Sequence, residues 1–282
     1  MKTLVVYYSR SNITKEIAKE IQNELNCDIE EIKPLKDYDG KTGYAKAGYE
    51  SMTKKTPKIE DAQHNPADYD LVVIGTPVWA STMASPVYTY LSQNKGKFNN
   101  VAFFATCGGS GDESTLKNMV KLVGKEGIAT YSATKRTVGD KSRLKEFTDA
   151  LKQWGENMAK MSAVTLGFLL TLVVYLFFGN YEFFGLMIVG FIVGYISKDG
   201  IFGGLWNAAL AGAFGTIIMA VLFIILITIG GTSLMGLLGG LVGFTFTGVG
   251  SLAYVIYKII YYAIVMGITG ALGGAIAGKN KW

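Results

Sequence analysis

The sequence predicts a doubly wound α/β domain with a parallel sheet, followed by an all-α transmembrane domain. Strand-like and helix-like segments alternate through the first 160 residues, as they do in βαβ units. The composition then changes: residues 1–160 hold 23 of the 27 Lys and Arg and 20 of the 22 Asp and Glu, whereas residues 161–282 hold 23 of the 35 glycines and no proline. We therefore expect two domains, 1–160 and 161–282, the second in a membrane.

Five short apolar runs in the first domain are predicted to be strands. The first, TLVVYY, is rich in β-forming residues, which is typical of a strand buried on both faces. The second, CDIEEIK, is only half apolar and is expected at an edge of the sheet. In chain order the predicted strands are residues 3–8, 27–33, 71–75, 101–106 and 128–134.

Helices are predicted between these strands. The segment ITKEIAKEIQNEL places Ile13, Ile17, Ile21 and Leu25 at four-residue spacing with charges on the other faces, which indicates an amphipathic helix. Residues 34–66 are expected to be irregular, with one short helix in TGYAKAGYESMTKK. The remaining predicted helices are residues 85–94, 113–124 and 142–160.

Three loops follow predicted strands at the edge of the sheet where a ligand would bind. In doubly wound sheets, ligands lie at the carboxyl ends of the strands, near the point where the strand order reverses. The loops at that edge are residues 9–14, 76–84 and 107–112. The function of the first domain should therefore be read from these loops.

The first loop, SRSNIT, is rich in hydroxyl and amide groups and begins a helix. Ser9, Ser11, Asn12 and Thr14 lie beside the free N–H groups of that helix start, which together with the helix dipole form an anion site suited to phosphate. Alternatively, Ser11 or Asn12 caps the helix, with Glu16 in the first turn. Neither GxGxxG nor a P-loop is present, which argues against a dinucleotide or a nucleoside triphosphate.

The first loop resembles the phosphate loop of the flavodoxin-like family of FMN proteins. That loop reads S/T-x-S/T-G-x-T in the family, and Ser9-Arg10-Ser11-Asn12-Ile13-Thr14 fits it except that Asn12 replaces the glycine. The departure is mild because Asn tolerates left-handed backbone angles.

The other two loops extend the resemblance over residues 1–158. A G-x-P-x-W-like loop after the third strand carries, in the family, an aromatic ring that stacks on the isoalloxazine, and a glycine-rich loop follows the fourth strand. The matching segments here are Gly75-Thr76-Pro77-Val78-Trp79-Ala80 and Thr106-Cys107-Gly108-Gly109-Ser110-Gly111.

The resemblance implies a flavodoxin-like five-stranded parallel sheet of order 2-1-3-4-5 and an FMN cofactor bound by the three loops. Stacking on the flavin by Trp79 would contribute about 0.5–1.5 kcal/mol beyond area burial. The alternatives are that Trp79 packs on the core and that residues 107–111 form an ordinary turn.

Other polar residues are weaker candidates. Cys107 has no His or Asp placed in sequence to activate it, so we expect a small packing residue and no catalytic side chain. His64, the only histidine, is expected to be solvent-exposed in a turn. Cys27 and Cys107 have no metal-ligand spacing and fit a reduced, cytosolic setting. Neither a metal nor a nucleic-acid partner is expected.

The second domain contains enough apolar sequence for four spans, or five. A bilayer core of about 30 Å needs roughly 20 apolar residues of helix. The apolar runs are separated by GNYE, KD, GGTS and Lys258, and are residues 162–178, 183–197, 200–229, 234–257 and 259–278.

Glycine pairs and one lysine are notable in these runs. Pairs of the GxxxG type predict close helix packing or a homo-oligomer; they are Gly190/Gly194, Gly236/Gly240, Gly239/Gly243, Gly270/Gly274 and Gly274/Gly278. Tyrosines surround Lys258, which indicates an interfacial belt with a snorkelling lysine, the alternative being a buried charge in a transport path.

These observations predict a multi-pass cell-membrane protein whose cytoplasmic flavodoxin domain passes electrons to redox partner proteins or a membrane quinone. One alternative is an FMN-dependent NAD(P)H or quinone reductase. Another is a membrane scaffold or channel with a flavin sensor domain. The first domain carries net +3, unlike the usually acidic flavodoxins, and this charge favours attraction to anionic lipid of the bilayer.

Overall fold

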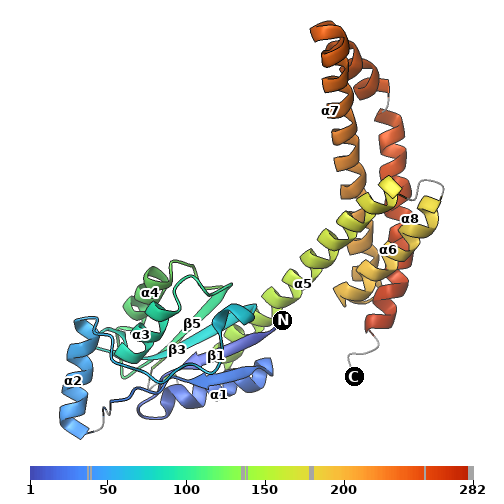
Figure 1. Ribbon diagram of the computed structural model, residues 1–282. Coiled ribbons are helices and arrows are strands. Elements are labelled where there is room, and N and C mark those ends of the chain that lie inside the picture. The colour runs from blue at the N-terminus through green and yellow to red at the C-terminus, as the bar shows by residue number, and fades with distance from the viewer. Residues whose placement is uncertain are drawn as a thin grey trace. The chain divides into compact units, whose positions relative to one another are not determined.

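The chain forms two compact units, Met1–Gly155 and Glu156–Trp282. The computed structural model describes residues 1–36, 38, 40–134, 137, 139–177, 181–250 and 252–278. The first unit is an α/β domain, and the second consists of helices (Figure 1).

A parallel sheet forms the centre of the first unit. Its strand order is β2-β1-β3-β5-β6, all parallel, and a two-residue strand, β4, pairs antiparallel with β3. The parallel strands taken alone have the predicted order 2-1-3-4-5, and β4 is an addition. The strands are β1 Thr3–Tyr7, β2 Asp28–Glu31, β3 Leu71–Trp79, β4 Thr82–Met83, β5 Val101–Cys107 and β6 Thr130–Thr134.

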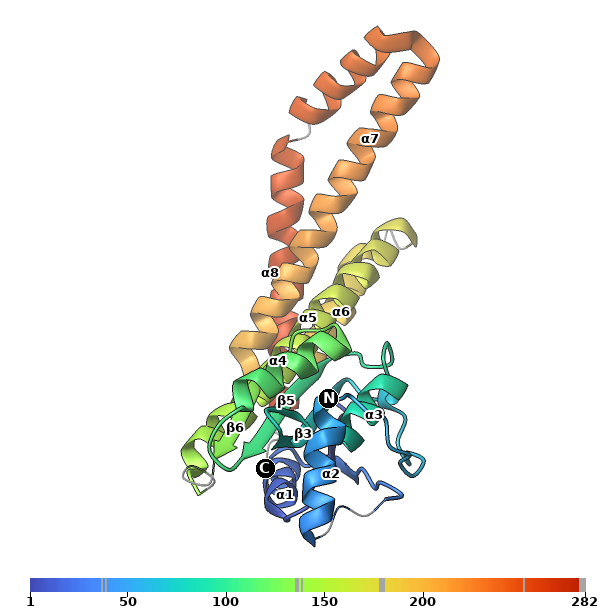
Figure 2. The ribbon, with the colours of Figure 1, turned by 90° about the vertical axis from the view of Figure 1, so that its left-hand side faces the viewer.

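Helices cover both faces of this sheet, which confirms the doubly wound class (Figures 1 and 2). Successive residues of β1 point to opposite faces: Leu4 and Val6 belong to one core, Val5 and Tyr7 to the other. The core of Val5 is closed by α1 and α5, and the core of Leu4 by α2, α3 and α4. The helices are α1 Ile13–Leu25, α2 Gly40–Met52, α3 Ser85–Gln93, α4 Asp112–Val123 and α5 Lys141–Phe177, with a short 3₁₀ helix at Pro66–Asp68.

Two predicted boundaries are wrong. The segment 76–84, expected to be a loop, continues β3 to Trp79 and turns back into β4, because main-chain pairing with β5 extends to Pro77 and pairing with β4 follows. The helix expected to end at residue 160 is one helix to Phe177, since no glycine pair or proline interrupts it.

The second unit contains α6 Glu182–Ser197, α7 Gly200–Gly250 and α8 Leu252–Gly278. Among the described residues, three segments are long and apolar enough to cross a membrane, in α5, α7 and α8, and α6 is a shorter apolar helix. Two of the segments that separate the apolar runs do not end a helix: GGTS lies within α7 and Lys258 within α8. Helices α7 and α8 lie side by side in both views (Figures 1 and 2).

Glycines bring α6, α7 and α8 into backbone contact. A Cβ on Gly194 or on Gly204 would overlap the carbonyl oxygen of Gly270, and one on Gly274 would overlap that of Gly200. The pairs Gly190/Gly194 and Gly270/Gly274 are therefore used within the chain, as small residues at close helix crossings are. The contacts of the two pairs in 236–243 lie outside the described residues.

Candidate functional site

The three predicted loops meet at the carboxyl edge of the sheet, because β1, β3 and β5 are neighbours. Thr14, in the first turn of α1, shares a 2.8 Å hydrogen bond with Thr106 at the end of β5. Ser114 Oγ, in α4, donates to the Ser81 carbonyl at the tip of the β3–β4 hairpin over 2.7 Å. These bonds tie the first and second loops to the two elements that flank the third loop, β5 and α4.

The first loop has the geometry of an anion site. Asn12 has φ 64°, so it occupies the left-handed region in which the family pattern has glycine. Asn12 occupies the N-cap position with Glu16 in the first turn, as the capping alternative expects, but its side chain makes no capping hydrogen bond. Ser11 is exposed. The Ser9 hydroxyl oxygen is buried without a hydrogen-bond partner among the described residues. A buried hydroxyl without a partner costs free energy, which a bound acceptor at this helix start would remove.

Thr14 and Thr106 lie beneath this loop. Both are buried, and their mutual hydrogen bond fixes the start of α1 against β5. Ile13 begins α1 and Arg10 is half-buried within the loop. The structure therefore divides the predicted phosphate residues into two groups: Ser9 and Ser11 have hydroxyls for a ligand, whereas Thr14 holds the loop in place.

The second loop is a two-residue hairpin with a strained tip. Ala80 and Ser81 have φ 47° and 59°, as a type I′ turn requires, yet neither is the Asn or Gly that this turn favours. Such left-handed angles cost non-glycine residues roughly 1–2 kcal/mol each. Thr76 secures the base of the hairpin: its buried hydroxyl accepts from the Ala84 N–H at 3.0 Å and donates to the Pro77 carbonyl at 2.9 Å.

Trp79, the last residue of β3, packs on aromatic neighbours. Its ring centroid lies 5.3 Å from that of Tyr8, edge to face, and 5.2 Å from that of Tyr38. With 7% of its surface exposed, it belongs to the core on the α3–α4 side. The core-packing alternative therefore describes Trp79 in this structure, and stacking on a flavin stays a prediction. Val78, before it, is half-buried.

The third loop is open to solvent. Gly108 and Gly109 are exposed, with room for a Cβ, and Ser110 is exposed beside them. Gly111 has φ 95° and begins α4, and a Cβ there would lie 3.0 Å from Ser81 Cα. A glycine is needed at this position for two reasons, the positive φ and the close approach of the hairpin.

Cys107, at the end of β5, is half-buried and has a thiol pKa raised above its usual value, mainly by burial. A raised pKa keeps the thiol neutral at pH 7 and makes it a poor nucleophile. This agrees with the expectation of a packing residue.

His64, expected to be exposed in a turn, lies in a bend and is half-buried. Its ring Nδ1 lies 3.2 Å from Glu30 Oε2, and its backbone N–H donates to the same carboxylate oxygen over 3.2 Å. Glu30 also accepts from the Gln63 N–H at 2.7 Å. These bonds hold the segment before the 3₁₀ helix against β2, the edge strand.

Tyr38 lies beside the site although no sequence pattern identified it. It is buried, and its hydroxyl donates to Glu50 Oε2 over 2.6 Å and lies 3.3 Å from Ser85 Oγ. Burial and the bond to Glu50 raise the pKa of Tyr38 to about 12, so it donates at any physiological pH. The sequence did not identify Tyr38 because residues 34–66 show no periodic pattern of hydrophobic residues.

The fold and the three loops define the class of protein. A five-stranded parallel sheet of order 2-1-3-4-5, with a hydroxyl-rich anion loop after β1, is the arrangement of flavodoxin-like proteins. Residues 2–158 match the family described as Flavodoxin, and the chain belongs to that family. Residues 161–278 match a family of unknown function, DUF5518. No curated protein matches the chain.

Solved structures resemble the first unit. A flavoprotein from Lactobacillus acidophilus NCFM in complex with FMN is 28% identical, with a TM-score of 0.44, over 52% of this chain and 98% of that chain. The apo form of the flavoprotein from that organism is 26% identical, with a TM-score of 0.36, over 49% and 95%. A flavodoxin, WrbA-like protein from Agrobacterium tumefaciens is 16% identical, with a TM-score of 0.36, over 54% and 98%.

Proposed function

We propose that the first unit binds FMN and that the protein passes electrons at a membrane to redox partner proteins or a membrane quinone. The observation that carries the proposal is the buried, unpaired Ser9 hydroxyl beside the free N–H groups at the start of α1. When bound, FMN supplies the redox chemistry, and the protein supplies binding, orientation and local charge. Family membership and the FMN complex of the Lactobacillus flavoprotein support the choice of cofactor.

The first and third loops have distinct tasks in this proposal. The first loop receives the phosphate through Ser9, Ser11 and the N–H groups of α1. The exposed backbone of Gly108 and Gly109 lets the ring edge approach closely, since no side chain intervenes. Cys107 takes no chemical part in this proposal, because burial raises the pKa of its thiol and keeps it neutral.

The full-length protein, purified in detergent, should be yellow, with about one FMN per chain by absorbance after extraction. Removing the flavin and titrating FMN back should restore the spectrum. A colourless protein that takes up no added FMN would refute the proposal. Slow turnover with NAD(P)H distinguishes a carrier from a reductase, for which two-electron turnover is fast.

Replacing Trp79 tests the proposed contact with the flavin. Trp79→Ala should weaken FMN binding and raise the fluorescence of bound flavin, because a stacked indole quenches it. Trp154→Ala is the matched control, since Trp154 packs on the opposite core. The two variants are compared by flavin fluorescence and by titration. If Trp79→Ala changes neither quantity, Trp79 serves the core alone.

We further propose four membrane crossings with the first unit in the cytoplasm. Lys160 and Asp199 form a 3.0 Å ion pair, which supports placing the start of the first span and the α6–α7 junction at one membrane face. Lys258 and Glu182 pair at 2.8 Å, which supports placing the starts of α6 and α8 at the other. Cytoplasmic flanks carry the excess of Lys and Arg, and Lys152 and Lys160 precede the first span.

Single cysteines test this topology. With Cys27 and Cys107 replaced, cysteines introduced at 152, 181 and 280 are treated with a membrane-impermeant thiol reagent on intact cells. Labelling at 181 alone is the expected result. Labelling at 280 would contradict four crossings, and labelling at 152 would contradict the cytoplasmic placement.

A further inference from the structure

The positive charge of the first unit is concentrated in one segment. Residues 40–58, which form α2 and the turn after it, contain five lysines and one glutamate, a net charge of +4. Because residues 1–160 carry net +3, the rest of that half carries net −1. The glutamate, Glu50, is buried against Tyr38, so the exposed charge of the described side chains in this segment is entirely positive.

The exposed large apolar side chains of the first unit lie on the same segment or beside it. Apart from Met1, those among its described residues are Leu35, Tyr49 and Met52, with 63%, 59% and 69% of their surface exposed. Large exposed apolar groups that cluster mark an interaction surface, whereas scattered ones do not.

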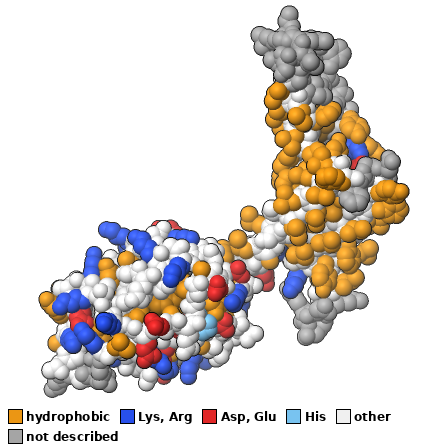
Figure 3. All heavy atoms as spheres, in the orientation of Figure 1, with side chains coloured by type: hydrophobic (Ala, Val, Ile, Leu, Met, Phe, Trp, Pro, Cys, Tyr) orange, Lys and Arg blue, Asp and Glu red, His pale blue; other side chains and the backbone are white. Residues whose placement is uncertain are grey.

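Contacts place several of these basic and apolar residues beside one another. The Lys55 ammonium lies 5.0 Å from the centre of the Tyr49 ring. The Leu35 backbone N–H donates to the Lys58 carbonyl over 3.0 Å, and the Lys55 N–H donates to the Glu50 carbonyl over 2.9 Å. We call this surface the α2 patch: Leu35, Lys46, Tyr49, Met52, Lys54, Lys55 and Lys58. In Figure 3, blue and orange side chains lie side by side at the left end of the first unit, where Figure 1 shows α2.

We propose that the α2 patch docks on the surface of an anionic lipid membrane. Lysines beside exposed aromatic and aliphatic side chains are the pattern of interfacial membrane binding, in which cations meet lipid headgroups and apolar groups enter the acyl boundary. These side chains alone would also suit a soluble acidic protein, and the proposed membrane anchoring decides for lipid, since it would hold the first unit beside a bilayer. The proposal rests on the proposed membrane anchoring, because the apolar helices of the chain would raise the effective concentration of lipid at the patch.

Docking at this patch would bear directly on the candidate site. The inner face of α2 is bonded to the site: Glu50 accepts from Tyr38, whose ring packs on Trp79, and Ser51 Oγ accepts from the Ser85 N–H at 3.1 Å. The exposed side of α2, with Lys46, Tyr49 and Met52, belongs to the patch. Contact with lipid would therefore place the Trp79 hairpin close to the bilayer surface, where a quinone is within reach.

The test uses the full-length protein in nanodiscs, with a nitroxide at Thr53→Cys and with Cys27→Ser and Cys107→Ser. Accessibility to oxygen, which concentrates in lipid, is compared with accessibility to a water-soluble nickel chelate. The discs contain phosphatidylcholine alone, or with phosphatidylserine. A nitroxide at Ser92→Cys, exposed on α3, is the reference site. Incorporation into discs and FMN content are measured separately, so failure of anchoring or of flavin binding is distinguished from failure of docking.

We expect the nitroxide at 53 to be shielded from the nickel chelate on discs with phosphatidylserine and open on phosphatidylcholine alone. Raising salt to 1 M, which shortens the screening length from about 10 Å to about 3 Å, should reduce the shielding. Reversing Lys46, Lys54, Lys55 and Lys58 to Glu should abolish it. Reversing Lys19, Lys95, Lys117 and Lys121 is the matched control and should not, since these exposed lysines lie outside the patch.

Two results would overturn the proposal. Equal exposure at 53 and 92 on both kinds of disc would mean that lipid does not cover the patch, and would direct the search to a soluble acidic partner. Shielding that is unaffected by lipid charge, salt and the four reversals would mean that the lysines do not recognise lipid.

Discussion

Ser9→Ala and Ser11→Ala should each weaken FMN binding while leaving riboflavin binding nearly unchanged. Only FMN carries the phosphate, and each lost hydrogen bond to a charged group costs about 1.5–3 kcal/mol. Since 1.4 kcal/mol corresponds to a tenfold change, the expected loss is roughly ten- to hundredfold for each variant. Fluorescence titration of the flavin-free protein with both ligands measures the difference.

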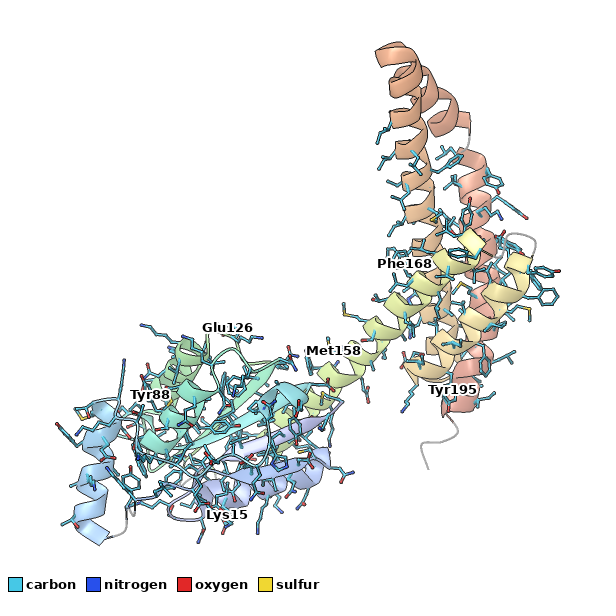
Figure 4. The ribbon with its side chains drawn as sticks, viewed as in Figure 1. Lys15, Tyr88, Glu126, Met158, Phe168 and Tyr195 are labelled. Carbon is cyan, nitrogen blue, oxygen red and sulfur yellow. The ribbon has the colours of Figure 1, made fainter. Side chains whose placement is uncertain are left out.

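The control for this experiment is Ser92→Ala, an exposed residue whose hydroxyl donates to the carbonyl of Tyr88 within α3 (Tyr88 is labelled in Figure 4). It should change neither affinity. Thr14→Ala is a different kind of variant, because it removes the bond to Thr106 that holds the loop, and it should lower thermal stability as well as affinity. Equal losses for FMN and riboflavin in the Ser9 and Ser11 variants would refute the assignment of the phosphate loop.

Lys258→Met should destabilise the second unit by about 3–5 kcal/mol, the usual cost of leaving one member of a buried ion pair alone. Lys258 Nζ lies 2.8 and 3.0 Å from the two carboxylate oxygens of Glu182, and both side chains are more than 80% buried. Adding Glu182→Gln should restore most of the loss, because the unpaired charge is removed. Unfolding in detergent micelles, followed by circular dichroism, measures the change.

An exposed pair provides the comparison. Lys152 and Glu24 lie 2.7 Å apart, yet 39% and 51% of their side-chain surfaces are exposed. Exposed pairs contribute about 0–1 kcal/mol, so Lys152→Met should have little effect. If Lys258→Met were as mild as Lys152→Met, Lys258 would be a snorkelling lysine, as the tyrosines around it suggested, and the ion pair would be incidental.

The sheet and its covering helices were predictable because their signals are local. The run TLVVYY and the four-residue spacing of Ile13, Ile17 and Ile21 each report burial directly, and β1 and α1 lie where these patterns placed them. The continuation of β3 to Trp79 was not predictable from Pro77 and Trp79, since it depends on pairing with strands distant in sequence. The length of α5 was missed because a change of composition, from charged to apolar, does not end a helix.

In the candidate site, too, features set by a local motif were predictable, and features set by contacts between distant residues were not. Asn12 could be identified as a left-handed residue because a motif fixes its backbone. The roles of Thr14 and Thr106 as mutual partners, and of Tyr38 beneath Trp79, arise from contacts across the sheet that no short motif encodes. The pairing of His64 with Glu30 belongs to the same group, as does that of Lys258 with Glu182.

Helix α5 has a consequence for how the protein is made. Its early residues, including Leu144, Phe147 and Leu151, complete a core of the first unit, and its later residues, including Ala163 and Val174, belong to the core of the second. Domains generally fold as units during synthesis, the N-terminal one first. Here the last piece of the first core leaves the ribosome only ten residues ahead of Met161, where the apolar segment starts. Closure of the sheet domain and delivery of the nascent chain to the translocation machinery must therefore occur together, with a single helix serving both.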